Sequence, residues 1–186
     1  MTSVAVSRGW RVTCRAHFEL PVSLPVAWGQ LRDFRRFAAQ DFFHTAVRVA
    51  SPGVRAGAAL EIDHRFGPFR TTRVGRILCW RENEGYSFSD LSANGPRSAF
   101  PHTYRYRLRP VSPGRCTVEI TVAGRWTTTR VPRPLVRLWL RWVFSHIAAS
   151  VRNTLIELTT RAVGAPITSP RSPSSPHRTN VPAAPT

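Results

Sequence analysis

The stretch YSFSDLSANGPRSAFPHTYRYRL, from Tyr86 to Leu108, holds two segments in which aromatic and polar side chains alternate around an NGP sequence. Alternation with a period of two is typical of half-buried β-strands, and NGP is typical of a turn. With the turn centred on Pro96 and Arg97, antiparallel pairing predicts three facing pairs on one face: Tyr86 with Tyr106, Phe88 with Tyr104, and Asp90 with His102. The hairpin therefore places an aspartate and a histidine among aromatic side chains.

The same alternation continues on both sides of this hairpin. Seven strands are predicted, at residues 10–20, 45–50, 58–66, 69–80, 86–91, 102–109 and 116–126. Between the first two strands, Ser23 is predicted to cap a helix with Pro25 in its first turn, and two short helical pieces are predicted to separate near Asp33. After Pro132 and Pro134 the period changes to three or four residues, which predicts one long helix over residues 135–162.

Composition favours one globular domain over residues 10–162, preceded by a short N-terminal extension (1–9). Residues 163–186 are rich in proline, serine and threonine, and this composition predicts a disordered tail. Three scattered cysteines favour neither a disulfide framework nor a cysteine metal site, so we expect a reducing, cytoplasmic location. We find no secretory signal and no apolar run of transmembrane length.

Charge is the most unusual property of the chain. All 27 basic side chains are arginine, and with ten acidic residues they give a formal charge of +17. A basic surface favours anionic partners such as nucleic acid or acidic lipid, although an arginine-only composition also fits GC-rich coding. No phosphate-binding loop, dinucleotide fingerprint, nucleophile elbow or helical histidine pair is present, so neither a cofactor nor a metal is predicted.

The order of these elements and the hairpin pattern resemble a known superfamily. The hairpin contains four short motifs in order: F-x-D, then G-P, then a single aromatic residue, then H-x-aromatic-x-aromatic. They are formed by Phe88 and Asp90, by Gly95 and Pro96, by Phe100, and by His102, Tyr104 and Tyr106. With Trp28, Ile77 and Trp80, this pattern resembles the SRPBCC or START-like superfamily, in its polyketide cyclase/dehydrase branch. The resemblance spans residues 10–162 and implies an α+β helix-grip fold, in which a curved antiparallel sheet of about seven strands wraps around the long C-terminal helix.

The resemblance also implies an apolar cavity between the sheet and the long helix. Its expected ligand-binding residues are His64, Phe66, Arg73, Arg76, Phe88, Tyr104, Tyr106, Ile120, Val122, Leu140, Val143, Ile147 and Val151. One register of the strand 69–80 turns Arg73 inward, and the other turns Arg70 and Arg76 inward. An arginine faces the concavity in either case. It can receive an anionic end of a ligand, or it can instead extend to the cavity mouth or pair with Asp90. On the first interpretation we expect a ligand with an apolar body and an anionic or strongly hydrogen-bonding end.

Three functions remain open from the sequence. The first is binding of a hydrophobic or amphipathic small molecule, such as a lipid or polyketide, in the cavity. The second is a cyclase or dehydratase in which Asp90 and His102 act as a catalytic acid and base, although the two residues can instead simply satisfy each other. The third is a basic adaptor that docks on anionic membrane or RNA, through three arginines of the long helix (Arg133, Arg137 and Arg141) that lie near Trp139 and Trp142 in the sequence.

Overall fold

The structure of this protein is a computed structural model that describes residues 10–50, 52–90, 100–127 and 131–164. The predicted extension (1–9), the NGP turn of the hairpin and the predicted tail beyond Gly164 lie outside these ranges, as does the side chain of Phe66. Within the described ranges, none of the three helices combines the length and the hydrophobicity that crossing a bilayer requires.

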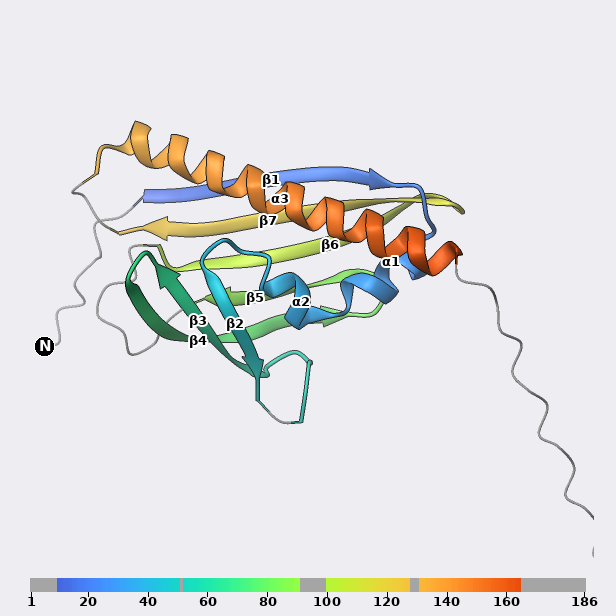
Figure 1. Cartoon of the computed structure of the whole chain (residues 1–186), viewed down its shortest axis with the longest axis horizontal. Helices are drawn as coiled ribbons and strands as arrows, with labels where there is room; N and C mark the ends of the chain where they lie inside the picture. Colours follow the sequence, from blue (N-terminus) through green and yellow to red (C-terminus); the bar gives the residue numbers. More distant parts are fainter. Residues whose placement is uncertain (1–9, 51, 91–99, 128–130, 165–186) are drawn as a thin grey trace, which may run out of the picture.

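Seven antiparallel strands form one sheet, as predicted. In chain order they are β1 (Trp10–Leu20), β2 (His44–Val49), β3 (Ala59–Phe66), β4 (Phe69–Arg81), β5 (Gly85–Asp90), β6 (His102–Ser112) and β7 (Arg115–Trp126). Their order in the sheet is β1-β7-β6-β5-β4-β3-β2, so the first strand pairs with the last and every other neighbour is a hairpin partner (Figure 1).

The register of the β5–β6 hairpin is the one predicted from its alternation. Tyr86 pairs with Tyr106, Phe88 with Tyr104, and Asp90 with His102. These side chains are all buried, whereas Arg105, Arg107 and Arg109 on β6 are exposed. The period of two thus separates the concave face of the sheet from its solvated face.

Two short helices and one long helix complete the chain: α1 (Leu24–Leu31), α2 (Phe34–Ala38) and α3 (Arg133–Gly164). Ser23 occupies the N-cap position of α1, but its side chain makes no capping hydrogen bond, and the first turn is closed by its backbone carbonyl instead. Asp33 caps α2 through a hydrogen bond from the Arg36 backbone N–H. Helix α3 is two residues longer at each end than predicted.

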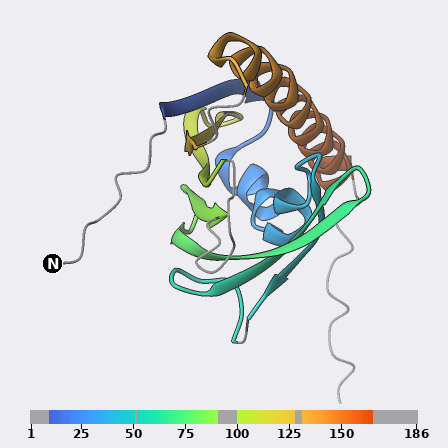
Figure 2. The same ribbon diagram turned by 90° about the vertical axis from the view of Figure 1, so that its left-hand side faces the viewer.

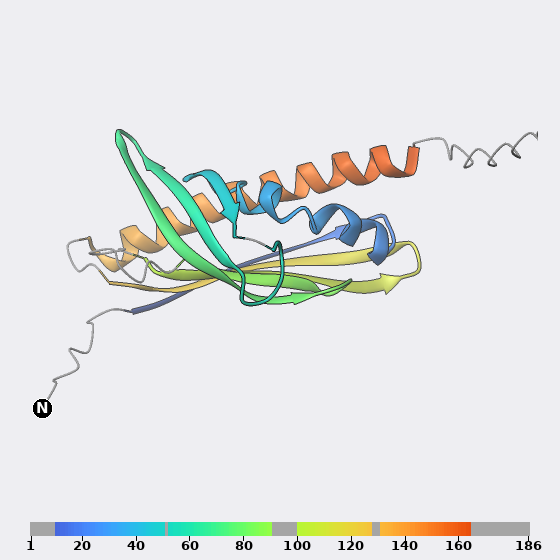
Figure 3. The same ribbon diagram turned by 90° about the horizontal axis from the view of Figure 1, so that it is seen from below.

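The sheet is strongly curved around the helices. Seen end-on, it curls around α1 and α2, and α3 lies across the open side of the curl (Figure 2). From below, β3 and β4 run steeply across the direction of β1 and β7 (Figure 3). This is the helix-grip arrangement that the sequence predicted.

Two groups of buried side chains fill the space between sheet and helices. The larger core contains residues of all three helices, including Trp28, Phe34 and Val151. A smaller cluster joins the start of β1 to the start of α3 through Val12, Trp126, Val136 and Leu140. The candidate site lies where these two groups meet.

Candidate functional site

A cavity of about 120 Å³ lies between the sheet and α3. Its apolar lining consists of Cys14, Phe43, Phe100, Val122, Trp126, Trp139, Leu140, Val143, Phe144 and Ile147. Its polar lining consists of Asp41, His44, His64, Arg73, His102 and Tyr104. The cavity is therefore apolar over most of its wall, with a cluster of titratable side chains contributed mainly by β2, β3, β4 and β6.

The structure places only part of the predicted lining around this cavity. Tyr104, Val122, Leu140, Val143 and Ile147 line it, together with His64, Arg73 and His102. The predicted positions Phe88, Tyr106, Ile120 and Val151 are instead buried in the main core.

Helices α1 and α2 explain this difference. The Phe34 ring packs edge-on against Phe88 at 5.1 Å between centroids, and the Tyr106 hydroxyl donates to the Phe37 carbonyl at 3.4 Å. The two short helices therefore fill one part of the concave face, and the cavity occupies only the part that they leave.

The orientation of the β4 arginines is now resolved. Arg73 pairs with Ile62, which is fully buried, and its side chain points inward with 14% exposure. Arg70 and Arg76 are exposed on the opposite face. The prediction of Arg76 as a ligand-binding residue is therefore wrong. Successive residues of a strand point to opposite faces, so Arg76, three positions after the inward-pointing Arg73, points outward.

Asp90, at the end of β5, is fully buried and forms the centre of the polar cluster. Its Oδ2 lies 2.9 Å from Arg73 Nη1 and 3.0 Å from His64 Nε2. Its predicted partner His102 faces it in the register, but their closest atoms are 3.7 Å apart. Asp90 is thus bound mainly by Arg73 and His64. Pairing of an inward β4 arginine with Asp90 was one of the alternatives that the sequence left open, whereas the contact with His64 was not expected.

The environment of Asp90 shifts its pKa in opposing ways. Burial raises the pKa, but the hydrogen bond with His64 and the Coulombic effects of His102, His64 and Arg73 lower it more, to about 2. Asp90 is therefore a carboxylate at neutral pH. Burial lowers the pKa of His102, against the opposite effect of Asp90, so its imidazole is neutral at that pH.

Three histidines of the cluster share one orientation. Nδ1 of His44 lies 2.6 Å from the Ala38 carbonyl, Nδ1 of His64 lies 3.1 Å from the Ile62 carbonyl, and Nδ1 of His102 lies 2.6 Å from the Phe100 carbonyl. Because a carbonyl oxygen only accepts, each Nδ1 carries the proton and donates it. Each ring is thereby fixed with Nε2 turned toward the cluster.

The sequence reasoning missed Asp41 and His44. Asp41, in the turn before β2, accepts a hydrogen bond from the Tyr104 hydroxyl and another from the Phe43 backbone N–H at 2.9 Å. His44 lies opposite His64, with their ring centroids 4.6 Å apart. A β-bulge between His44 and Ala46 creates this pairing, because counting back from Val49 without a bulge places His44 opposite Arg65.

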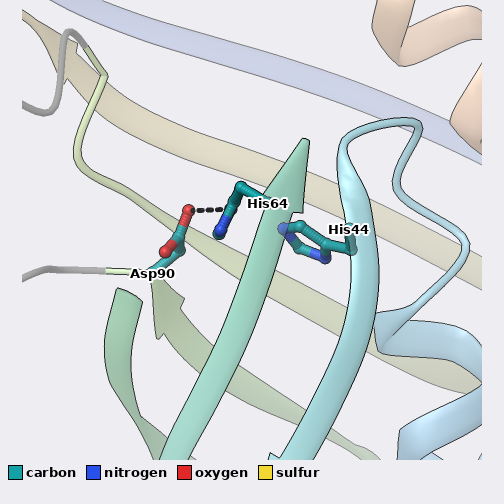
Figure 4. A group of neighbouring side chains, drawn as sticks. All are labelled: His44, His64 and Asp90. Atoms are coloured by element: carbon teal, nitrogen blue, oxygen red, sulfur yellow. Dashed lines mark hydrogen bonds and ion pairs between the residues drawn. The ribbon is translucent and has the colours of Figure 1, made fainter. Parts of the chain in front are cut away.

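Two buried atoms of the cluster have no hydrogen-bond partner among the described residues: His44 Nε2 and Asp90 Oδ1. Figure 4 shows His44, His64 and Asp90 side by side, on β2, β3 and the end of β5. In a neutral ring with Nδ1 protonated, His44 Nε2 is an acceptor, and Asp90 Oδ1 is a carboxylate oxygen, so each atom suits a donor or a cation.

Comparison with known proteins defines the fold class. No protein-family model matches the sequence, and a sequence comparison with curated proteins finds no match. The structure, however, is similar to solved helix-grip proteins at low sequence identity. The chain therefore has the helix-grip fold.

Three solved structures illustrate the similarity. The Zhui aromatase/cyclase from Streptomyces sp. R1128 superposes with a TM-score of 0.64 and 11% identity, over 84% of this chain and 98% of that one. The di-domain aromatase/cyclase StfQ of the steffimycin biosynthetic pathway has a TM-score of 0.65 and 11% sequence identity, over 83% of this chain and 52% of that one. A norcoclaurine synthase point mutant from Thalictrum flavum, in complex with a transition-state analogue, has a TM-score of 0.60 and 9% sequence identity. This match covers 87% of this chain and 100% of that one.

Proposed function

We propose that this protein binds a small molecule with an apolar body and a hydrogen-bonding end inside the cavity. The observation that supports this most is the composition of the wall, which is aromatic and aliphatic except for one polar cluster. The names of the structural neighbours, two aromatase/cyclases and a synthase in complex with a transition-state analogue, are consistent with a small-molecule ligand.

The cavity volume limits the size of the enclosed part of the ligand. At 120 Å³ the cavity is slightly smaller than the engineered apolar cavities of about 150 Å³ that accept benzene. A single aromatic ring, a short branched chain or the end of a longer molecule has the appropriate size.

The polar cluster favours a neutral donor over an anion at the other end of the ligand. Arg73, the inward arginine, already forms an ion pair with Asp90, so its charge is compensated inside the protein. The unpartnered atoms His44 Nε2 and Asp90 Oδ1 both accept hydrogen bonds. His44 belongs to the cavity lining, so a phenolic or alcoholic hydroxyl group of the ligand can satisfy its Nε2, whereas a carboxylate has no proton to donate.

This proposal is tested by titrating the protein with p-cresol, toluene and benzoate while recording the fluorescence of Trp126 and Trp139, which line the cavity. We expect p-cresol to bind most tightly. Val143→Phe fills the cavity and abolishes binding, whereas the control Val111→Phe, at an exposed position of β6, does not. Absence of binding for all three compounds, or equal binding by both variants, contradicts the proposal.

The polar cluster also favours a second candidate function, acid–base turnover of the bound ligand as in a cyclase or dehydratase. Neutral His102 lines the cavity with Nδ1–H bonded to the Phe100 carbonyl, so Nε2 is free of a proton and has the form of a general base. Its 3.7 Å distance to Asp90 gives the resulting imidazolium a nearby carboxylate.

The test of this candidate is deuterium exchange at the carbons next to the carbonyl of a small ketone such as acetophenone, followed by NMR. Exchange that is accelerated by the protein and lost in His102→Gln supports turnover. Exchange at the uncatalysed rate with a ketone that binds shows that the cavity only holds its ligand.

A surface feature bears on the proposed contact with anionic membrane or RNA. Leu135, Leu138, Trp139 and Trp142 follow the i, i+3, i+4, i+7 spacing of one face of α3, and they are 41–67% exposed. Phe42, which is 68% exposed, lies against Trp142. We propose that this apolar stripe, which we define as these five residues, docks on an anionic membrane surface; RNA is the alternative partner.

A further inference from the structure

The polar cluster contains three side chains in the arrangement of a metal site. Nitrogen atoms of His44 and His64 and a carboxylate oxygen of Asp90 lie within 4.8 Å of one another. Two ligands that bind the same zinc-sized ion, each at about 2.0–2.2 Å, are roughly 3–4 Å apart. From this geometry we infer that His44, His64 and Asp90 bind one divalent transition-metal ion of the zinc type.

The two histidine rings are already held in the orientation that a metal requires. His44 donates Nδ1–H to the Ala38 carbonyl and His64 donates Nδ1–H to the Ile62 carbonyl. Metal-binding histidines characteristically use the second ring nitrogen in this way, which fixes the tautomer and aims the first nitrogen at the ion. The other nitrogen is Nε2 in both cases: that of His44 has no hydrogen-bond partner among the described residues, and that of His64 lies 3.0 Å from Asp90 Oδ2.

The unpartnered atoms give independent support. His44 is 7% exposed and Asp90 is fully buried, yet His44 Nε2 and Asp90 Oδ1 have no hydrogen-bond partner among the described residues. An unsatisfied buried acceptor destabilises the folded state. A cation bound by His44 Nε2 and by the Asp90 carboxylate gives both groups a partner.

The charge of the ligands suits a divalent ion. Asp90 Oδ2 accepts a hydrogen bond from Arg73 and lies 3.0 Å from His64 Nε2, so the side chain offers a carboxylate to the metal. His64 Nε2 lies 3.0 Å from Asp90 Oδ2, so the metal replaces the contact between these two ligands with a bond to each. Asp41, whose Oδ2 lies 3.8 Å from His44 Nε2, adds negative charge nearby.

The ligand set indicates which metals are preferred and that one coordination position is open. Two imidazoles and one carboxylate favour ions such as Zn²⁺, Fe²⁺ or Co²⁺ over Mg²⁺ and Ca²⁺, which prefer oxygen ligands alone. Three protein ligands leave a coordination position open, and His44 and His64 both face the cavity. The inference does not depend on the proposed ligand, which is tested separately on chelator-treated protein.

Arg73 is the group that opposes metal binding. Its guanidinium lies 2.9 Å from Asp90 Oδ2 and carries the same sign of charge as the metal. Arg73→Gln removes this charge and leaves all three ligands in place. We therefore expect this variant to bind the metal more tightly than the wild type, a result that a purely structural role of the cluster does not produce.

The experiment is a titration of the full-length, chelator-treated protein with Co²⁺, followed by its visible absorption, with Zn²⁺ competition as a second readout. We expect one Co²⁺ per chain with a spectrum of nitrogen and oxygen ligands. Loss of a direct ligand in His44→Ala or Asp90→Asn weakens binding by at least about tenfold, the lower limit seen even for outer-shell partners. His146→Ala, at an exposed histidine of α3, serves as the control and binds as the wild type does.

Each contrary result overturns the inference. Binding that is unchanged in His44→Ala, or lost in His146→Ala, places the ion elsewhere. A sulfur-to-cobalt charge-transfer band shows cysteine ligation. If His44→Ala or Asp90→Asn is unfolded by circular dichroism, the decision rests on Arg73→Gln, for which unchanged or weaker binding is the contrary result.

Discussion

Asp90 and Asp63 both have pKa values of about 2, but their surroundings differ. Asp63 lies on the outer face of β3, where hydrogen bonds from Arg48 and Thr72 lower its pKa, and its side chain is 30% exposed. Asp90 is fully buried and depends on Arg73 and His64. Solvent can replace the partners of Asp63 but not those of Asp90.

This difference predicts the effect of neutralising each carboxylate. Asp90→Asn leaves a guanidinium and an imidazole without their buried partner, so we expect it to lower the free energy of unfolding by about 3 kcal/mol at neutral pH. The matched control Asp63→Asn has a clearly smaller effect. Urea unfolding measures both, and equal losses mean that burial does not determine the strength of these pairs.

The low pKa of Asp90 also predicts a pH dependence. In the unfolded chain the pKa is near 3.9, so as pH falls from about 4 toward 2 the unfolded state takes up the proton first and stability is lost. This difference in pKa contributes about 2–3 kcal/mol to the free energy of unfolding, and the contribution is fully present above pH 4. Unfolding of wild type and Asp90→Asn at pH 7 and about pH 2.5 checks this, because the difference in stability between them narrows at acid pH. A constant difference contradicts it.

At the level of the elements, alternation predicted the strands because each has one buried face. It also predicted the β5–β6 register, since that hairpin pairs without a bulge from Gly85 to Asp90. The position of His44 was not predictable in this way, because the bulge at the start of β2 shifts its partner by one residue. The extent of the cavity was not predictable either, because it depends on how far α1 and α2 cover the sheet, which the pattern of one strand does not contain.

The contact between β4 and β5 predicts a strong effect at a small residue. A Cβ atom on Gly75 meets the Ser89 carbonyl oxygen at 1.9 Å, so Gly75→Ala forces the two strands apart. We expect a loss of more than about 2 kcal/mol by urea unfolding. Gly29→Ala is the matched control, because Gly29 is exposed in α1 with nothing within 4 Å, and there we expect a gain of about 0.5–1 kcal/mol. Similar effects at both glycines contradict the close approach.

For the molecule as a whole, the apolar stripe and the cavity lie on the same part of the structure. Trp139 belongs to both, and Phe43 of the cavity lining packs against Phe42 and Trp139. Arg133 and Arg137 lie over the Trp10 ring, and both of them are exposed, as is Arg141. A surface that holds exposed aromatic residues within a chain of charge +17 is suited to an anionic membrane, and docking there brings the cavity close to an apolar phase.

Vesicle binding tests this arrangement. Because burying one large apolar side chain contributes about 1.5–3 kcal/mol, Trp142→Glu or Leu138→Glu reduces affinity for vesicles rich in phosphatidylglycerol at least about tenfold. Val74→Glu, at an apolar position of β4 that is 51% exposed, adds the same charge outside the stripe and serves as the control. Weaker binding in high salt and on neutral phosphatidylcholine vesicles identifies the contribution of the arginines, since each basic residue near an anionic surface is worth about 1 kcal/mol. Equal losses in all three variants mean that only net charge matters, and salt-sensitive binding of RNA without binding to vesicles makes a nucleic acid the partner instead.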